Sequence, residues 1–312
     1  MRIEKIEEYY KISSQAVVKV TEAGNVTELL YLSKKNSEQP IRLLGDKKYV
    51  DLRTGEVKNF IEHEDKRTEH KNSLYRTFAT LRGIINSNIN NPSRVRHIIL
   101  TYAECMTDNK RLYNDFKNFN MKFQYKYKKA EYIAVAEPQR RGAWHLHILY
   151  IFPDLAPFLP NDELAKMWGH GFTKIKALDK SVDNIGLYFC AYMTDIEIEY
   201  VNIKTVASDR VKTVEVTDEE TGKKVNKRYL KGGRLSLYPS GMNIFRTSRG
   251  IARPTEYTST YGTAIEKLNG ATPTYTNTIK ITDEAGAYSP IIIKREYYNT
   301  KRINNSQSQD NV

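Results

Sequence analysis

The stretch Arg140–Phe152, RRGAWHLHILYIF, places His145 and His147 two residues apart within an otherwise apolar run. Its aromatic and β-branched residues predict a strand over 144–152. Side chains at i and i+2 of a strand point to the same face, so the two imidazoles would stand side by side. Because an unpaired buried polar ring is costly, either each ring has a hydrogen-bond partner or something binds between them.

A second predicted strand, AEYIAVAEPQ (130–139), precedes this one, and the turn PQRRGA between them predicts an antiparallel hairpin. If the turn occupies 139–143, Glu137 lies opposite His145 on the same face. A turn one residue shorter or longer directs Glu137 to the other face, and the sequence leaves this register open. With Glu137 in place, two imidazoles and one carboxylate would suit a divalent ion that keeps positions open for a substrate.

Other periodic segments extend the pattern on both sides of the hairpin. Apolar residues at helical spacing predict one helix from Ser73 onward and a second helix after Thr107 and Asp108, which look like its N-cap. A short helix is expected over 160–171. Strands are expected at 95–104 and 172–178, and a helix capped by Ser181 over 181–197. The order from residue 74 is α-β-α-β-β-α-β-α. The central hairpin indicates an α+β fold, an antiparallel sheet with helices packed on one side.

The sequence as a whole predicts four segments. Residues 1–70 are a β-rich N-terminal region and residues 71–200 carry the sheet with the HxH hairpin. Residues 201–298, which include a predicted hairpin with DEETG at its turn, are a basic extension. Residues 299–312 are a polar tail of the composition that disordered segments have.

Charge and composition restrict the partners and the compartment. The 312 residues carry a formal net charge of +12, which favours an anionic partner such as nucleic acid. Two cysteines and no metal-type cysteine pair indicate a reducing compartment without a disulfide framework. No apolar run reaches membrane-spanning length and the first residues lack the apolar core of a signal peptide, so we expect a cytoplasmic protein without a membrane partner.

The segment IGLYFCAYMTD (185–195) places Tyr188 and Tyr192 four residues apart, hence on one side of the predicted helix. Ile185, Phe189 and Met193 form a separate apolar stripe that can be buried. A tyrosine hydroxyl can act as a covalent nucleophile, although two packed aromatic residues would show the same spacing.

Three segments in this order resemble the HUH endonucleases, in particular the rolling-circle replication initiators (Rep proteins) of plasmids and small phages. They are IILTYAE (98–104), AWHLHILYIF (143–152) and IGLYFCAYMTD (185–195). The resemblance covers about a third of the chain. KGGRLSLYPSGMNIFRTSRGI (231–251) resembles a segment that follows the nuclease core in such proteins.

The resemblance implies a metal-dependent nicking and joining enzyme with an HUH-type sheet. His145 and His147 would ligate Mg²⁺ or Mn²⁺, with Glu137 as the third ligand. Tyr188 or Tyr192 would attack a DNA phosphate, which leaves a 5′-phosphotyrosine and a free 3′-OH primer. The tyrosines follow the histidines in the chain, as in Rep proteins.

One feature departs from the phage-type motif, which has a lysine three residues after the tyrosine. Here those positions hold Ala191 and Asp195. Which tyrosine attacks first is therefore open, with Tyr192 favoured because Asp195 is polar and lies one turn further on.

The implied partners are single-stranded or hairpin origin DNA, the host DNA polymerase and a host helicase, in the cytoplasm of a bacterial cell. A host helicase is needed because the sequence contains no GxxxxGK[ST] motif.

Basic residues near the motifs are candidate DNA contacts, although a solvated basic surface would have the same composition. The stretch 223–253 interleaves cations with aromatic residues and holds no Asp or Glu, which is typical of single-strand binding. His97 is interpreted as an ordinary polar residue. The candidate contacts are Arg140, Arg141, Lys174, Lys176, Arg234, Arg246 and Arg249.

Two other functions remain open from the sequence. The chain could be a non-catalytic protein that binds single-stranded or hairpin nucleic acid on the same fold. It could also be a hydrolase that uses the HxH metal site without a covalent intermediate, and whose cleavage would survive loss of both tyrosines.

Overall fold

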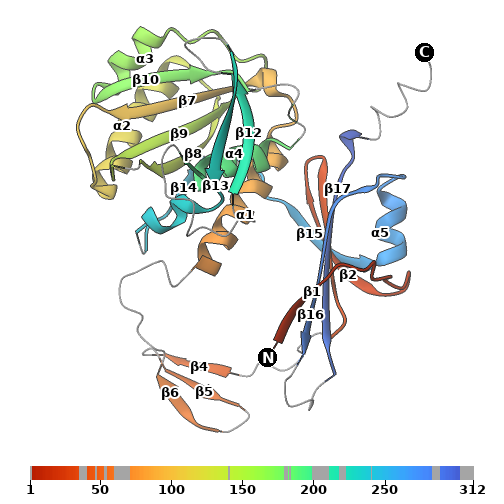
Figure 1. Cartoon of the computed structure of the whole chain (residues 1–312). Helices are drawn as coiled ribbons and strands as arrows, with labels where there is room; N and C mark the ends of the chain where they lie inside the picture. Colours follow the sequence, from red (N-terminus) through yellow and green to blue (C-terminus); the bar gives the residue numbers. More distant parts are fainter. Residues whose placement is uncertain are drawn as a thin grey trace, which may run out of the picture. The chain divides into compact units, whose positions relative to one another are not determined.

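The computed structural model describes residues 2–34, 41–45, 48–52, 55–59, 71–139, 141–178, 182, 184–198, 211–217, 223–239, 241–282 and 289–302. Figure 1 shows the chain coloured from its N-terminus to its C-terminus. The contacts between residues divide it into two compact units. The first contains residues 1–22, 26–66 and 255–312, and the second contains 23–25 and 67–254. This division differs from the boundaries expected at 70, 200 and 298, because strands from both ends of the chain share one sheet.

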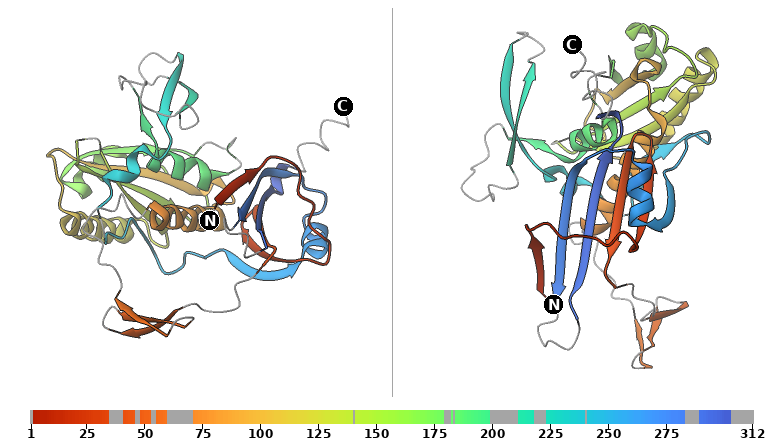
Figure 2. Two further views of the ribbon diagram at one scale, coloured as in Figure 1. Left: turned by 60° about the horizontal axis from the view of Figure 1, so that its bottom comes forward. Right: turned by 90° about the vertical axis from the view of Figure 1, so that its right-hand side faces the viewer.

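The first unit is built on a six-stranded sheet in the order β1-β16-β17-β3-β2-β15. Figure 2 shows this sheet strongly curved, with helix α5 (Tyr261–Lys267) beside it. Three further strands form a small sheet of their own, in the order β4-β5-β6. The predicted β-rich N-terminal region is thus confirmed. The strands are β1 (Arg2–Ile6), β2 (Val17–Ala23), β3 (Val26–Leu32), β4 (Ile41–Gly45), β5 (Lys48–Asp51), β6 (Val57–Asn59), β15 (Thr255–Thr260), β16 (Pro273–Thr282) and β17 (Ile291–Asn299).

The second unit contains the predicted antiparallel sheet, which has five strands in the order β10-β7-β9-β8-β14. The β8–β9 hairpin lies at its centre, so the α+β fold is confirmed. The strands are β7 (Val95–Tyr102), β8 (Glu131–Pro138), β9 (Trp144–Ile151), β10 (Gly171–Lys176) and β14 (Phe245–Thr247). The helices are α1 (Lys71–Asn88), α2 (Asn109–Lys126), α3 (Asn161–Trp168) and α4 (Ile185–Thr194), and the short turn η2 (Pro92–Arg94) precedes β7.

Helices cover both faces of this sheet. On the face that bears Tyr102 and Tyr150, here called the tyrosine face, Phe123 of α2 stacks on Tyr150 with ring centres 3.8 Å apart. On the opposite face, here called the histidine face, Phe189 of α4 lies 5.3 Å from the ring of His97. The expectation of helices on one side only is therefore wrong. Because β7 and β9 are almost continuously apolar, they can be buried on both faces.

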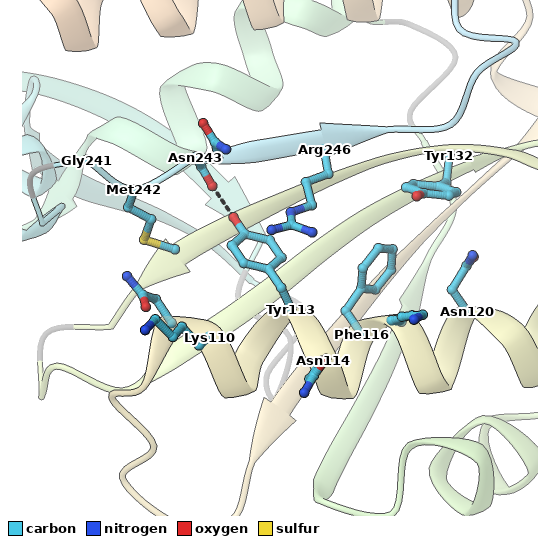
Figure 3. A pocket seen from close by; sticks show the side chains of 12 residues that line it. Lys110, Tyr113, Asn114, Phe116, Asn120, Tyr132, Gly241, Met242, Asn243 and Arg246 are labelled. Atoms are coloured by element: carbon cyan, nitrogen blue, oxygen red, sulfur yellow. Dashed lines mark hydrogen bonds between the residues drawn. The ribbon is translucent and has the colours of Figure 1, made fainter.

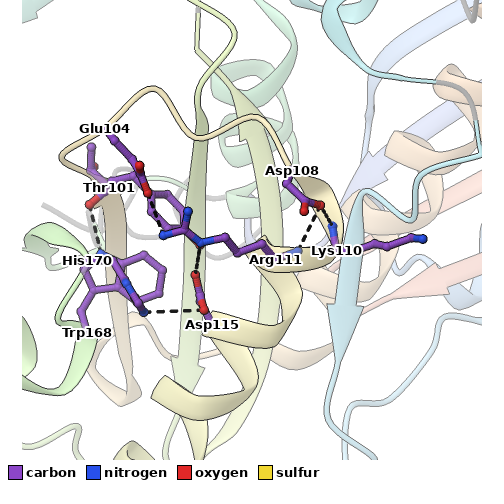
Figure 4. Close-up of polar contacts among 9 residues, drawn as sticks. Thr101, Glu104, Asp108, Lys110, Arg111, Asp115, Trp168 and His170 are labelled. Atoms are coloured by element: carbon purple, nitrogen blue, oxygen red, sulfur yellow. Dashed lines mark hydrogen bonds and ion pairs between the residues drawn. The ribbon is translucent and has the colours of Figure 1, made fainter.

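Helix α2 begins where its cap predicts. The Asp108 carboxylate accepts hydrogen bonds from the backbone N–H groups of Lys110 (2.7 Å) and Arg111 (3.2 Å), as Figure 4 shows. Arg111 pairs with Glu104 after β7 (2.7 Å) and lies 3.5 Å from Asp115 of the same helix. These contacts hold the first turns of α2 against the end of β7.

Helix α4 begins later than predicted. Its N-cap is Asn184, whose side chain accepts from the N–H of Leu187 (3.0 Å) and from the amide of Asn86 on α1 (3.0 Å). Ser181, the predicted cap, lies outside the described residues. Gly186 allows the two helices to approach closely, because a Cβ at this position would lie 2.4 Å from a backbone oxygen of α1.

The region after residue 200 forms the predicted hairpin and then rejoins the main sheet. Strands β12 (Val211–Thr217) and β13 (Lys224–Leu230) pair, and β11 (Ile196–Glu197) completes their sheet. The turn between β12 and β13 lies mostly outside the described residues, as does the tail beyond residue 302. A short turn, η5 (Gly233–Leu237), leads to β14 beside β8. In the described part of the chain, no helix is long and apolar enough to span a membrane.

Candidate metal centre and DNA pocket

The hairpin turn sets the register on which the candidate site depends. The N–H of Gln139 donates to the carbonyl of Ala143 (2.7 Å), which closes the turn, and Gly142 takes the left-handed conformation (φ 88°) that favours glycine. Glu137 consequently lies directly opposite His145. The condition that the sequence left open is thus met, and the carboxylate shares the histidine face.

Glu137, His145 and His147 form a possible metal-binding triad, in which the ligand atoms all lie within 4.8 Å of one another. The Nε2 atom of His147 is in close contact with Glu137 Oε2. The Nε2 atom of His145 is buried and has no hydrogen-bond partner among the described residues. Such an atom is costly unless something binds it, so these donors fit a divalent ion.

The protonation states at this triad suit a cation. Burial lowers the pKa of His145 to about 4, so its ring is neutral near pH 7. Burial alone would raise the pKa of Glu137. The hydrogen bond to His147, together with electrostatic interactions with His147, Arg234 and His145, outweighs that effect and lowers the pKa of Glu137. A neutral imidazole and an ionised carboxylate are the forms that bind metal.

His97 is a residue of the site that sequence reasoning missed. Its Nε2 lies 3.0 Å from His147 Nδ1, and the two residues are 7% and 1% exposed. This hydrogen bond holds the His147 ring so that its Nε2 atom points at Glu137. Residues that hydrogen-bond the second nitrogen of a histidine in this way commonly orient it as a metal ligand. Only the pairing of β7 with β9, with Ile99 opposite His147, shows that His97 shares their face.

Arg234 of η5 reaches into the site rather than standing on the surface. Its Nη1 atom lies 2.7 Å from Glu137 Oε1 and donates to the carbonyl of Pro138 (3.1 Å), and its Nε donates to the carbonyl of Asp195 (3.3 Å). The side chain is only 16% exposed. These contacts give Arg234 a position from which it holds the Glu137 carboxylate in place.

The triad opens into a pocket of about 590 Å³ on the histidine face. Strand β10 contributes Phe172, Lys174 and Lys176, which lie on this face because they pair opposite Thr101, Ile99 and His97. The structure therefore brings both predicted lysines together with the triad. Phe172, 70% exposed, was missed. The alternation in FTKIKAL could have identified it, because Phe172 shares its parity with the two lysines.

The two tyrosines lie on α4, one helical turn apart. Tyr188 is 59% exposed and lines a smaller pocket of about 90 Å³ together with His97 and Lys176. Lys176 also lines the pocket over the triad. Tyr188 is thus placed at the border of the candidate site, and the side chain of Tyr192 lies outside the described part of the structure.

Asp195 caps the end of α4 and is buried. Its carboxylate pairs with Lys212 of β12 (2.5 Å) and accepts from the N–H of Gly232 (2.8 Å). Asp195 therefore anchors the helix to the following hairpin. Because this carboxylate is already paired, Asp195 gives no reason to favour Tyr192, and which tyrosine attacks first stays open.

The other predicted DNA contacts are dispersed. Arg141 is exposed in the hairpin turn and donates to Gln139 (3.0 Å), whereas Arg140 lies outside the described residues. Arg246 pairs opposite Ala134 and so lies on the tyrosine face, away from the triad. Arg249 is exposed in the loop after β14.

Residues 96–197 match a family model of replication-associated proteins, the ORF2 type. The match covers about a third of the chain. No curated protein and no solved structure matches the chain. This match shows that residues 96–197 are related to replication-associated proteins, which supports a role in replication initiation. The matched segment contains the whole triad, both β10 lysines and both α4 tyrosines.

Proposed function

We propose that this protein is a rolling-circle replication initiator that nicks and rejoins one DNA strand through a 5′-phosphotyrosine intermediate. The observation that carries the proposal is the triad of Glu137, His145 and His147, which opens into a lysine-bearing pocket inside the segment that matches replication-associated proteins. Further support comes from α4, which carries both tyrosines and packs on the same sheet face through Phe189.

The triad would hold Mg²⁺ or Mn²⁺, which polarises the scissile phosphate and stabilises the charge of the transition state when bound. His97 and Arg234 hold two of the ligands in their orientations. Lys174 and Lys176 attract the strand through its phosphates, and the exposed ring of Phe172 offers a surface on which a base can stack.

The covalent step uses a tyrosine of α4. The hydroxyl oxygen of Tyr188 or Tyr192 forms a bond to the phosphorus while the bond from phosphorus to the 3′ oxygen breaks. The phenol loses its proton to solvent, and the departing 3′ oxygen takes up a proton to become the primer hydroxyl. The exchange of one P–O bond for another is nearly neutral in energy, so a 3′-OH can reverse the step and rejoin the strand. Two tyrosines would permit two successive strand transfers.

The proposed partners follow from this chemistry. The DNA would be single-stranded or hairpin origin DNA of a plasmid or phage in the cytoplasm of a bacterial host. A host polymerase would extend the 3′-OH, and a host helicase would separate the strands.

A denaturing gel of the protein with single-stranded origin DNA and Mn²⁺ tests the proposal. The expected result is a protein–DNA adduct that EDTA prevents. DNA binding without cleavage would favour the non-catalytic binding protein. Cleavage that survives replacement of both Tyr188 and Tyr192 by Phe would favour a hydrolase without a covalent intermediate.

A further inference from the structure

A second polar pocket, of about 530 Å³, lies between α2 and β14 (Figure 3). It belongs to the tyrosine face: Tyr132, which lines it, pairs opposite Tyr150, and Arg246 pairs opposite Ala134. The metal-binding triad lies on the other face of the same sheet. A ligand in this pocket is therefore separated from the triad by the thickness of the sheet.

The lining of this pocket is cationic. Lys110 and Lys117 project from α2 and Arg246 from β14, and no Asp or Glu lines the pocket. All three side chains belong to exposed residues, and none forms an ion pair with another described residue. Three cations without a carboxylate favour an anionic ligand.

Arg246 is held in a defined orientation. Its guanidinium carbon lies 3.8 Å from the ring centre of the buried Tyr113, a cation–π contact, and the Tyr113 hydroxyl donates to the carbonyl of Asn243 (Figure 3). A planar guanidinium fixed in this way keeps its outer N–H groups available for a phosphate.

Aromatic rings and amides complete the lining. The rings of Phe116 and Tyr132 meet edge to face with centres 5.2 Å apart. Asn120 is held by the hydroxyl of Tyr150 (2.8 Å), and further asparagines from α2 reach the same pocket. Phe116 is buried, so the partly exposed ring of Tyr132 is the one that offers a surface for a base, and the amides offer both donors and acceptors to its edge.

We propose that this pocket binds a nucleotide of single-stranded DNA and forms a second DNA contact that is independent of the triad. The identification of the strand as DNA rests on the proposed function. A free nucleotide has the same chemistry, but a strand suits the cations better. Lys110 and Lys117 are seven residues apart, roughly 10 Å along the helix axis, which is further than one phosphate extends.

Anisotropy of a labelled oligothymidylate of about ten nucleotides tests this pocket, with the full chain in EDTA so that no cleavage occurs. Arg246→Gln should weaken binding roughly tenfold, because a charge-assisted contact to phosphate is lost. Arg94→Gln is the matched control: it removes the same charge from an exposed arginine that does not line the pocket, and it should change affinity by less than about twofold. Lys117→Gln should weaken binding by about threefold.

Equal losses in the Arg246 and Arg94 variants would show a general basic surface and overturn the proposal, as would no loss in either. Equilibrium dialysis with thymidine monophosphate separates the two ligand sources. If Arg246→Gln abolishes nucleotide binding but leaves oligonucleotide affinity unchanged, the pocket takes a free nucleotide and the strand proposal is wrong. Because no step depends on the nicking reaction, failure of the pocket and failure of the proposed enzyme are distinguishable.

Discussion

Replacing His97 with Leu should weaken Mn²⁺ binding by roughly 10- to 100-fold without unfolding the protein. His97 would not contact the metal itself. It holds the ring of His147 through the bond between His97 Nε2 and His147 Nδ1, which are 3.0 Å apart. Leucine fills much of the same volume but offers no acceptor.

The magnitude follows from the burial of this pair. The two residues are 7% and 1% exposed, so water cannot replace the lost partner of His147 Nδ1. Losing such a partner costs about 1–3 kcal/mol. Since about 1.4 kcal/mol corresponds to a tenfold change, the metal dissociation constant should rise about 5- to 150-fold if the whole cost falls on ligand orientation.

Calorimetric titration with Mn²⁺ measures this change, and two variants serve as controls. Phe189→Leu removes the ring that packs 5.3 Å from His97 and 6.2 Å from His147 but keeps their hydrogen bond, so it should change affinity by less than about threefold. His97→Gln retains an acceptor and should recover part of the affinity. A folded His97→Leu protein that binds Mn²⁺ like the wild type would show that this hydrogen bond does not support metal binding, as would an equal loss in Phe189→Leu.

Three further outcomes are expected. Changing Tyr188 and Tyr192 together to Phe should abolish the adduct on denaturing gels while DNA affinity stays within about twofold, because only hydroxyls are lost; an adduct in the double variant would contradict this. Because the pKa of buried His145 is lowered to about 4, the unfolded state binds more protons between about pH 4 and 6.5. Without metal, the free energy of unfolding should therefore fall as pH drops through this range, measured by urea denaturation, and the fall should be smaller in His145→Gln. Phe172→Ser should weaken single-strand binding about five- to tenfold in anisotropy titrations. Phe158 is also exposed but lies outside the pocket, so Phe158→Ser should leave the affinity unchanged. Equal effects of the two changes would exclude base stacking on Phe172.

The sheet of the second unit could be predicted because its signals are local. The apolar runs around His145 and on β7 predicted strands, and the turn that contains Pro138 and Gly142 predicted the hairpin. Asp108 marked the start of α2 correctly. The position of Glu137 required one further fact, the length of the turn, because a shift of one residue changes the face of every side chain.

The rest of the site depends on pairing between distant segments. His97 joins His147 only through the register of β7 with β9, and Arg234 reaches Glu137 from nearly a hundred residues away. Arg246 looked equivalent to Arg234 in the basic stretch, yet strand pairing places it on the opposite sheet face. The shared sheet of the first unit is a similar case, since β1 pairs with β16 across most of the chain.

Mass spectrometry of the adduct peptide, formed with single-stranded origin DNA and Mn²⁺, identifies the residue that attacks the DNA. We expect a 5′-phosphate on Tyr188 or Tyr192 of α4, and no modified peptide when His147 is replaced by Ala or when EDTA is present. A 5′-phosphotyrosine at any other residue, or an adduct that forms without the metal or without His147, would contradict this expectation.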